Sequence, residues 1–289
     1  MSDPATRLRI AVQKSGRLSE SSLTLLKDCG IRVQRGRNSL IAPASNFALD
    51  VLYLRDDDIP QYVADGTADC GILGENVVLE SGAKVSTERQ LGFGSCRLSL
   101  AVPKSVQYEG VSYFQHRKIA TSYPVILEDF LRRHGVEADI HEISGSVEIA
   151  PNIGLADGIC DIVSTGSTLF SNGLKEVEHV LKSQAVLVAR PDLDAERRAV
   201  LEALLFRMAA VQRAADSKYI VMNVPRERVE AVERILPGIK SPTIVPLMRE
   251  GWVAVHSVVD EATFWEVIDE LRGAGAEGIV VVPIQKMVV

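Results

Sequence analysis

The sequence predicts an α/β protein with two lobes and a smaller third module. Through the first two thirds of the 289 residues, short apolar runs alternate with stretches of helical periodicity. That order is typical of a mostly parallel sheet, whose ligands bind where strands end and helices begin. The alternation starts afresh near residue 96, which predicts a second lobe and a ligand cleft between the two. The last third has the order βαββαβ, which is the ferredoxin-like pattern.

The first lobe is expected to contain residues 1–95 together with residues 175–215. Its expected strands are 8–12, 50–54 and 69–73, and its expected helices are 18–29, 59–64 and a helix after residue 76. Two further strands, 177–181 and 185–189, are expected to return to this lobe from the second one. Residues 194–215 are expected to form a long connector helix.

The second lobe is expected to span residues 96–174. Its expected strands are 97–102, 118–121, 138–143 and 159–163, with helices at 123–134 and 147–153. A separate module of residues 217–289 is then expected. Its predicted elements are strand 218–224, helix 226–236, strands 243–247 and 253–259, helix 261–272 and strand 278–283.

Composition excludes several classes of protein. With 38 acidic and 32 basic residues the net charge is −6, which argues against general affinity for nucleic acid. No apolar run is long enough for a membrane span, and the first residues lack the apolar core of a signal peptide, so we expect a cytoplasmic protein with no membrane partner. The four cysteines include no C-x-x-C pair and are expected to be reduced core residues, while the five scattered histidines make a zinc site unlikely.

A loop rich in hydroxyl groups is the most informative segment. Ser164, Thr165, Gly166, Ser167 and Thr168 follow an apolar strand and precede a helix. Backbone N–H groups and hydroxyls in such a loop can converge on one anion, although an ordinary N-cap has the same appearance. Asp161 on the preceding strand favours the anion site slightly, because an acid there suits a ribose diol or a Mg²⁺–phosphate group.

Several other polar residues leave two interpretations open. Lys14, Gly16 and Arg17 lie in a strand–loop–helix segment that would either bind phosphate or be solvated. The acids 56–58 would form either a metal site or, as we favour, a helix cap. Asp69 and Gly71 lie on an otherwise buried strand, where an acid needs a partner. Glu148 would either face the cleft or cap its short helix.

Taken together, a set of segments resembles the ATP phosphoribosyltransferase family in its long form, nearly end to end. The segments are Arg9-Ile-Ala-Val-Gln-Lys-Ser-Gly-Arg-Leu, Asp56-Asp-Asp-Ile-Pro, Asp69-Cys-Gly-Ile-Leu-Gly-Glu-Asn, Cys96-Arg-Leu-Ser-Leu, Ile119-Ala-Thr-Ser-Tyr-Pro, Gly145-Ser-Val-Glu-Ile-Ala-Pro, Asp161-Ile-Val-Ser-Thr-Gly-Ser-Thr-Leu, Asn172-Gly-Leu, Ser241-Pro-Thr-Ile and Val281-Val-Pro-Ile. Each is weak alone, and their order along the chain is specific.

The resemblance implies transfer of the 5-phosphoribosyl group from phosphoribosyl pyrophosphate to N1 of the ATP adenine, the first step of histidine biosynthesis. It further implies two catalytic lobes of the periplasmic-binding-protein type, a requirement for Mg²⁺, assembly of dimers into a homohexamer, and feedback inhibition by histidine. The ligands of the metal stay open.

The resemblance also implies roles for individual residues. The loop 164–168 would hold the 5-phosphate, and Glu148 and Asp161 would be catalytic, meeting the ribose hydroxyls or Mg²⁺. Ser167 stands where other members of the family have Ala, Thr or Arg. The residues expected to bind ATP are Lys14, Gly16, Arg17, Asp69, Gly71 and Cys96.

The C-terminal module resembles amino-acid-binding regulatory domains. Histidine is therefore the expected effector, with Asn223, Ser241, Pro242 and Thr243 as its expected contacts. The alternative is that Pro242 merely begins an edge strand, where a missing N–H is tolerated. An alternative for the whole chain is a non-catalytic two-lobed sensor of small molecules with an amino-acid-binding appendage.

Overall fold

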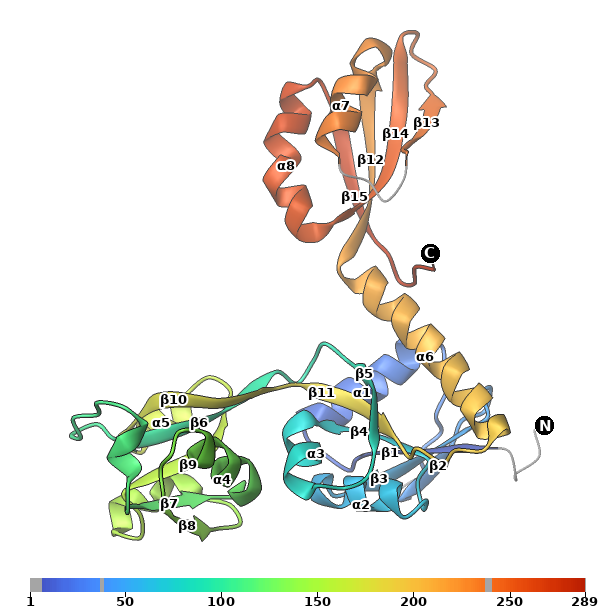
Figure 1. The fold of residues 1–289 in the computed structure, drawn as a ribbon. Coiled ribbons are helices and arrows are strands. Elements are labelled where there is room, and N and C mark those ends of the chain that lie inside the picture. The colour runs from blue at the N-terminus through green and yellow to red at the C-terminus, as the bar shows by residue number, and fades with distance from the viewer. Residues whose placement is uncertain (1–6, 37–38, 237–240, 289) are drawn as a thin grey trace. The chain divides into compact units, whose positions relative to one another are not determined.

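The computed structural model describes residues 7–36, 39–236 and 241–288, and divides into two compact units, Met1–Glu202 and Ala203–Val289. Two separate sheets form two lobes within the first unit (Figure 1). Among the described residues, no helix is both long and apolar enough to cross a membrane.

The six-stranded sheet of the first lobe has a parallel centre, because β1 pairs in parallel with both β3 and β4. Its order is β2-β3-β1-β4-β11-β5. The strands are β1 (Leu8–Gln13), β2 (Ile41–Pro43), β3 (Leu49–Leu54), β4 (Cys70–Gly74), β5 (Ser86–Gln90) and β11 (Ala185–Ala189), and the helices are α1 (Arg17–Asp28), α2 (Ile59–Ala64) and α3 (Glu75–Ser81). The expected strands of this lobe are confirmed, apart from 177–181.

The five-stranded sheet of the second lobe has the order β10-β6-β9-β7-β8. Its elements are β6 (Cys96–Pro103), β7 (Lys118–Thr121), α4 (Pro124–Arg133), β8 (Asp139–Glu142), β9 (Gly158–Val163), α5 (Ser167–Ser171) and β10 (Leu174–Ser183). Helix α4 buries Ile126, Leu127, Phe130 and Leu131, which is the spacing of one helical face. The single helix expected over 147–153 is instead two 3-10 turns, Val147–Ile149 and Pro151–Ile153.

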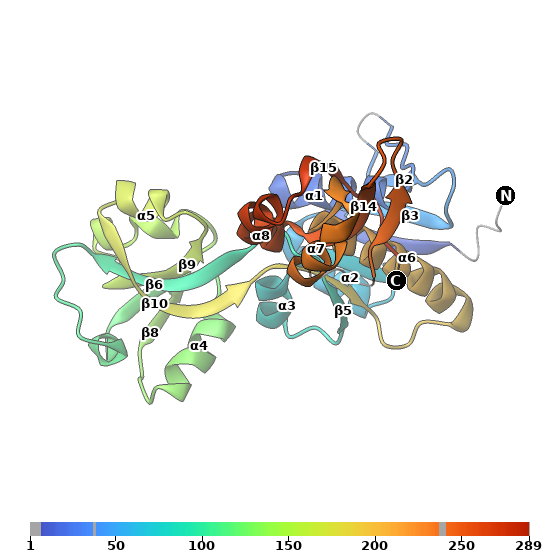
Figure 2. The same cartoon turned by 90° about the horizontal axis from the view of Figure 1, so that it is seen from above.

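Strand 177–181 belongs to the second lobe, so its assignment to the first lobe was wrong. Residues 174–183 form β10, which pairs antiparallel with β6. The apolar side chains of Val177, Val180 and Leu181 pack against the core of the second lobe. The chain therefore crosses between the lobes twice, from β5 to β6 and from β10 to β11 (Figures 1 and 2). Two α/β lobes with two such crossings form the expected periplasmic-binding-protein architecture.

The second unit has the expected ferredoxin-like order. Its elements are β12 (Ser217–Pro225), α7 (Val229–Ile235), β13 (Thr243–Pro246), β14 (Trp252–Asp260), α8 (Glu261–Gly273) and β15 (Glu277–Pro283). The sheet order is β13-β14-β12-β15. Both helices cover one face, where Met222 of β12 and Val255 of β14 pack with Val232 and Phe264 (Figure 1). The boundary between the units falls within α6 (Ala195–Ala215), whereas the sequence placed it after residue 215.

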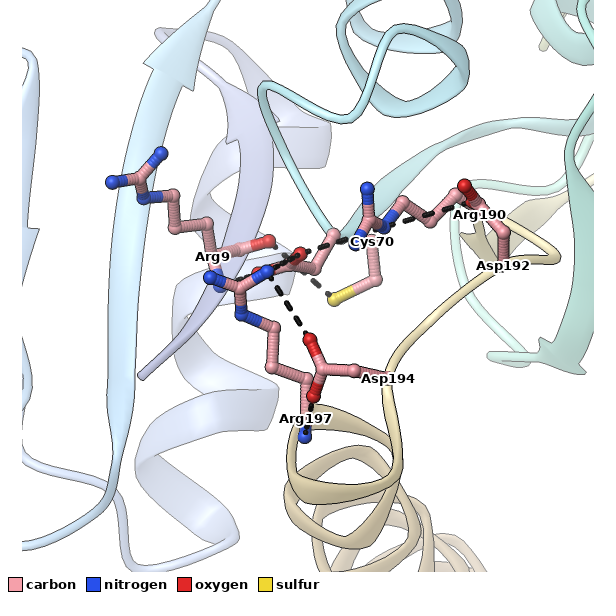
Figure 3. Close-up of polar contacts among 7 residues, drawn as sticks. Arg9, Cys70, Arg190, Asp192, Asp194 and Arg197 are labelled. Carbon is pink, nitrogen blue, oxygen red and sulfur yellow. Dashed lines mark hydrogen bonds and ion pairs between the residues drawn. The ribbon is translucent and has the colours of Figure 1, made fainter. Parts of the chain in front are cut away.

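One buried carboxylate joins three separate parts of the first unit. Asp69, directly before β4, accepts a hydrogen bond from the backbone N–H of Arg9 at 2.8 Å. Its Oδ1 lies 3.7 Å from Nε of Arg190 after β11 and 3.6 Å from Nη1 of Arg197 in the first turn of α6 (Figure 3). The Asp69 side chain is only 3% exposed, so its charge needs these partners. The carboxylate therefore fixes the start of α6 to the first lobe.

We predict that Asp69→Ala lowers the free energy of unfolding by about 3 kcal/mol, because it removes the buried carboxylate that two arginines share and the acceptor of one backbone N–H. Urea unfolding followed by circular dichroism measures this change. Asp69→Asn, which keeps an acceptor for Arg9, should lose less. The matched control is Asp192→Ala, since Asp192 lies 3.8 Å from Arg190 but is 79% exposed, and its loss should be within about 0.5 kcal/mol. Wild-type stability in Asp69→Ala would contradict a structural role.

Candidate active site

The hydroxyl-rich loop connects β9 to the short helix α5. Gly166 takes the left-handed conformation, with φ 79°, at the N-cap of α5, which favours glycine at this position. The hydroxyls of Thr165 and Ser167 lie 3.0 Å apart, and the side chains of Ser164 and Thr168 are exposed. The loop therefore presents several hydroxyls to solvent beside backbone N–H groups, an arrangement that can bind an anion.

Asp161 and Glu148 lie close enough for their charges to interact. Burial raises the pKa of Asp161 and the charge of Glu148 raises it further, while the backbone N–H of Ile162 lowers it. Glu148 lies in a turn that follows two residues in the left-handed conformation, Gly145 (φ 83°) and Ser146 (φ 51°). A non-glycine residue there is uncommon and often marks a functional site. Ser146, at the N-cap position of this turn, forms no side-chain cap hydrogen bond, and Glu148 is the acid of its first turn.

The carboxylates of Asp161 and Glu148 fit Mg²⁺ only in a site whose other ligands come from the substrate and water. Within the described residues, no group of three or more His, Cys, Asp or Glu side chains could hold a metal ion. Mg²⁺ is commonly bound by one or two carboxylates together with substrate phosphates and water. Asp161 and Glu148 match that donor set, because they are oxygen ligands beside the candidate anion loop.

The second candidate phosphate loop follows β1 at the carboxyl edge of the first sheet. The backbone N–H of Lys14 donates to the carbonyl of Leu54 at 2.8 Å, which joins this loop to the end of β3. Gly16, with φ 94°, precedes the first turn of α1. The side chains of Lys14 and Arg17 are exposed, so both cations are available to an anionic ligand.

The acids after β3 lie at the N-terminus of α2, as expected of a cap. Asp56–Asp58 form a 3-10 turn, and Asp58 occupies the N-cap position of α2 without a side-chain hydrogen bond. Asp56 has an environment that the sequence did not predict, since its Oδ1 is buried without a hydrogen-bond partner. Burial raises the pKa of Asp56 to about 6, with a smaller contribution from Asp57. Only the run of acids after a strand could have signalled it.

Tyr123 of the second lobe lies among acids from both lobes, and sequence reasoning missed it too. Its pKa is raised by burial first and then by the charges of Asp161, Asp57 and Asp56. Tyr123 helps to line a cavity of about 450 Å³ whose walls come from both lobes. The full lining is Asp57, Val77, Glu80, Ser81, Ser122, Tyr123, Pro124, Glu142, Ile143, Ser144 and Gly145.

Glu80 joins the two lobes beside this cavity. From α3 in the first lobe, its two carboxylate oxygens accept the backbone N–H groups of Val125 and Ile126 in α4, at 2.8 and 3.0 Å. These N–H groups belong to the first turn of α4, where no partner exists within the helix. A negative charge also suits a helix N-terminus.

A further cavity of about 510 Å³ lies beside the crossings and reaches Ser164. It is lined by Glu75, Gln90, Ser95, Cys96, Arg97, Ser164, Lys182, Ser183 and Gln184. Burial raises the pKa of the Cys96 thiol, and a hydrogen bond with Ser183 lowers it. Cys96 therefore lies at a crossing between the lobes, and its contact with a nucleotide stays a prediction.

Asp69 and Gly71 do not lie with the Lys14–Arg17 loop. Asp69 precedes β4, at the amino end of the parallel strands, and its ion-pair partners are Arg190 and Arg197. A Cβ at Gly71 would lie 2.6 Å from Cγ2 of Ile59, so this glycine allows α2 to pack on β4. Neither residue lies at the carboxyl edge of the sheet, and their contact with ATP stays a prediction.

Two of the expected effector residues, Asn223 and Thr243, share one face of the four-stranded sheet of the second unit. Since Met222 and Val224 face the helices, alternation places Asn223 on the opposite face. Register pairs Asn223 with Ala254, and Thr243 with His256 on the same strand β14, so Thr243 shares that face. Ser241 and Pro242 directly precede β13.

Comparison with known proteins gives concordant results. Residues 55–210 match the HisG family, described as ATP phosphoribosyltransferase, and residues 214–286 match the HisG C-terminal domain. A protein of Cytophaga hutchinsonii named ATP phosphoribosyltransferase is 57% identical over 284 residues, which cover 98% of this chain and 99% of the relative. One from Bacteroides thetaiotaomicron with the same name is 55% identical over 282 residues, covering 98% of this chain and 100% of the relative.

A solved structure agrees with these sequence matches. The ATP phosphoribosyl transferase (HisG:HisZ) complex from Thermotoga maritima contains a chain that aligns with a TM-score of 0.60 at 30% identity. The alignment covers 70% of the present chain and 98% of the other. From its sequence matches and its two-lobed fold, the chain belongs to the ATP phosphoribosyltransferase family.

Proposed function

We propose that the chain transfers the 5-phosphoribosyl group from phosphoribosyl pyrophosphate to N1 of ATP and releases pyrophosphate, the first step of histidine biosynthesis. Identity above one half along the whole length of relatives named for this activity carries the proposal. The site adds chemical support, because the hydroxyl-rich loop lies beside two interacting carboxylates.

The reaction breaks the bond from ribose C1 to pyrophosphate and forms the bond from C1 to N1 of adenine. Positive charge develops on the sugar and negative charge on the leaving group, so positioning and charge stabilisation would supply most of the catalysis. The nitrogen N1 carries a free lone pair and needs no strong base. A site without a nucleophile–histidine pair therefore suits this chemistry.

The residues divide the work between the two substrates. Residues 164–168 would hold the 5-phosphate with hydroxyl and backbone donors, while Lys14 and Arg17 would neutralise phosphates from the opposite lobe, with Gly16 shaping their loop. Asp161 and Glu148 would hold the ribose hydroxyls or the Mg²⁺ ion, and Cys96 would lie near the nucleotide. Bound Mg²⁺ supplies charge neutralisation at the pyrophosphate.

Regulation and assembly belong to the same proposal. Residues 217–289 would form a domain that binds histidine through Asn223, Ser241, Pro242 and Thr243 and inhibits the active site. We also propose a cytoplasmic protein that assembles from dimers into homohexamers. The match of residues 214–286 to the HisG C-terminal domain supports a separate domain in this part of the chain.

The direct test is to incubate the chain with ATP, phosphoribosyl pyrophosphate and Mg²⁺ and to measure pyrophosphate. Release that depends on both substrates supports the proposal. A sensor that binds both compounds and releases no pyrophosphate would contradict it.

We predict that the double variant Thr165→Ala/Thr168→Ala loses two hydrogen bonds to the charged 5-phosphate, each worth about 1.5–3 kcal/mol. The KM for phosphoribosyl pyrophosphate should therefore rise roughly a hundredfold or more, while thermal unfolding stays near that of the wild type. Ser171→Ala, at the far end of α5, is the control and should leave this KM unchanged. Normal saturation of the double variant would remove the loop from the phosphate site.

We predict that Thr243→Ala, in an edge strand of the four-stranded sheet of the second unit, keeps activity and loses most of the inhibition by histidine. Coupling between two sites is reciprocal, so histidine should bind the wild type with a different affinity once phosphoribosyl pyrophosphate is present. Calorimetry with and without the substrate measures this difference. Thr263→Ala on α8 should keep normal inhibition. A wild-type enzyme that is active but indifferent to millimolar histidine would exclude the regulatory role.

A further inference from the structure

Arg97 lies where its side chain can reach the beginning of the hydroxyl-rich loop. It is the second residue of β6, and the register of β6 and β9 pairs it with Val163, the last residue of β9. The next residue is Ser164. Nη1 of Arg97 donates to the Ser164 carbonyl at 3.3 Å.

A carboxylate on the other neighbouring strand fixes the orientation of this guanidinium. Nε and Nη2 of Arg97 donate to the two carboxylate oxygens of Glu176 in β10, at 2.5 and 2.6 Å. One edge of the planar group is thereby occupied, which leaves Nη1 for the Ser164 carbonyl. Such a bidentate pair fixes direction as well as distance, and an ammonium group cannot reproduce it.

Glu176 is itself held in place. Its Oε1 accepts the hydroxyl of Ser99 at 2.7 Å and lies 3.1 Å from Nε2 of His179. Hydrogen bonding by Arg97 is the largest cause that lowers the pKa of Glu176, to about 2. The carboxylate is therefore charged throughout the neutral pH range, and the Arg97–Glu176 pair does not switch with pH there.

We propose that Arg97, oriented by Glu176, is a positioning residue that aims the 164–168 loop at the 5-phosphate. A trans peptide is planar, so its C=O and the following N–H point in opposite directions. With the Ser164 carbonyl held on Arg97, the N–H of Thr165 points away from the guanidinium. The β6–β10 pair thus sets the direction of the first donor of the loop. The inference rests on the phosphoribosyl transfer proposed above.

The test is the steady-state kinetics of Glu176→Gln, a variant whose changed side chain contacts Arg97 and the strands of the sheet rather than the loop. It should raise the KM for phosphoribosyl pyrophosphate about tenfold, the loss of roughly one hydrogen bond to a charged group. The KM for ATP and kcat should change less than about twofold, since the Lys14–Arg17 loop lies on the other lobe. The control is Glu178→Gln on the same strand, whose partner is the hydroxyl of Tyr108 at 3.1 Å, and it should behave as the wild type.

Two variants of Arg97 distinguish positioning from direct contact with the substrate. If Arg97 acts through its fork on the loop, Arg97→Lys should lose as much affinity as Arg97→Met. A wild-type KM in Arg97→Lys would overturn the inference, because charge alone would then suffice. So would an unchanged KM for phosphoribosyl pyrophosphate in Glu176→Gln, or an equal rise in both KM values.

These outcomes are separable from failure of the proposed function. An inactive wild-type chain would contradict the transferase proposal. An active wild type with unaffected variants would contradict only the role of Arg97. Calorimetric binding of phosphoribosyl pyrophosphate by the wild type and Glu176→Gln supplies a readout that needs no turnover, and weaker binding by the variant is expected.

Discussion

The two crossings between the lobes determine how the residues on the two sides of the cleft are placed. They are hydrogen-bonded to one another, since Ala185 accepts the N–H of Leu91 and donates its own N–H to the carbonyl of Phe93, both at 2.9 Å. Beside them the buried Ser183 hydroxyl donates to Oδ1 of Asn76 at 2.8 Å and accepts the N–H of Asn76 at 3.1 Å. Parts of the chain distant in sequence thereby share one hydrogen-bonded junction, and β6 and β10 extend from it into the second lobe.

The positions of the candidate functional residues follow from the direction of the strands in each lobe. In the first lobe, the parallel strands β1 and β3 bring Lys14, Arg17 and the acids 56–58 to one edge. In the second, β9 delivers Asp161 and then the hydroxyl-rich loop. Cationic groups and hydroxyls therefore suit the phosphates, whereas the acids suit ribose, Mg²⁺ and the positive charge that develops on the sugar. Glu80 of the first lobe accepts two backbone N–H groups of α4 in the second lobe, so neutral backbone donors also join the lobes beside the cleft.

Much of this arrangement could be predicted from the sequence. Periodicity is a local property, so it identified β9, the loop and the βαββαβ module. It could not place β10, because an amphipathic strand after a crossing fits either sheet until its partner is known. The partners of Asp69 could not be predicted for a related reason: a buried acid requires a partner, but its arginines lie about 120 residues further along the chain. Tyr123 was missed because the acids near it, Asp161, Asp57 and Asp56, come together only in the folded chain.

The position at which the 5-phosphate binds tests the proposed active site most directly. A crystal structure of the chain with phosphoribosyl pyrophosphate and Mg²⁺ should show that phosphate within hydrogen-bond distance of the hydroxyls of Thr165 and Thr168, with Asp161 and Glu148 facing the ribose or the metal. A 5-phosphate bound instead at Lys14 and Arg17, with the 164–168 loop unoccupied, would contradict it.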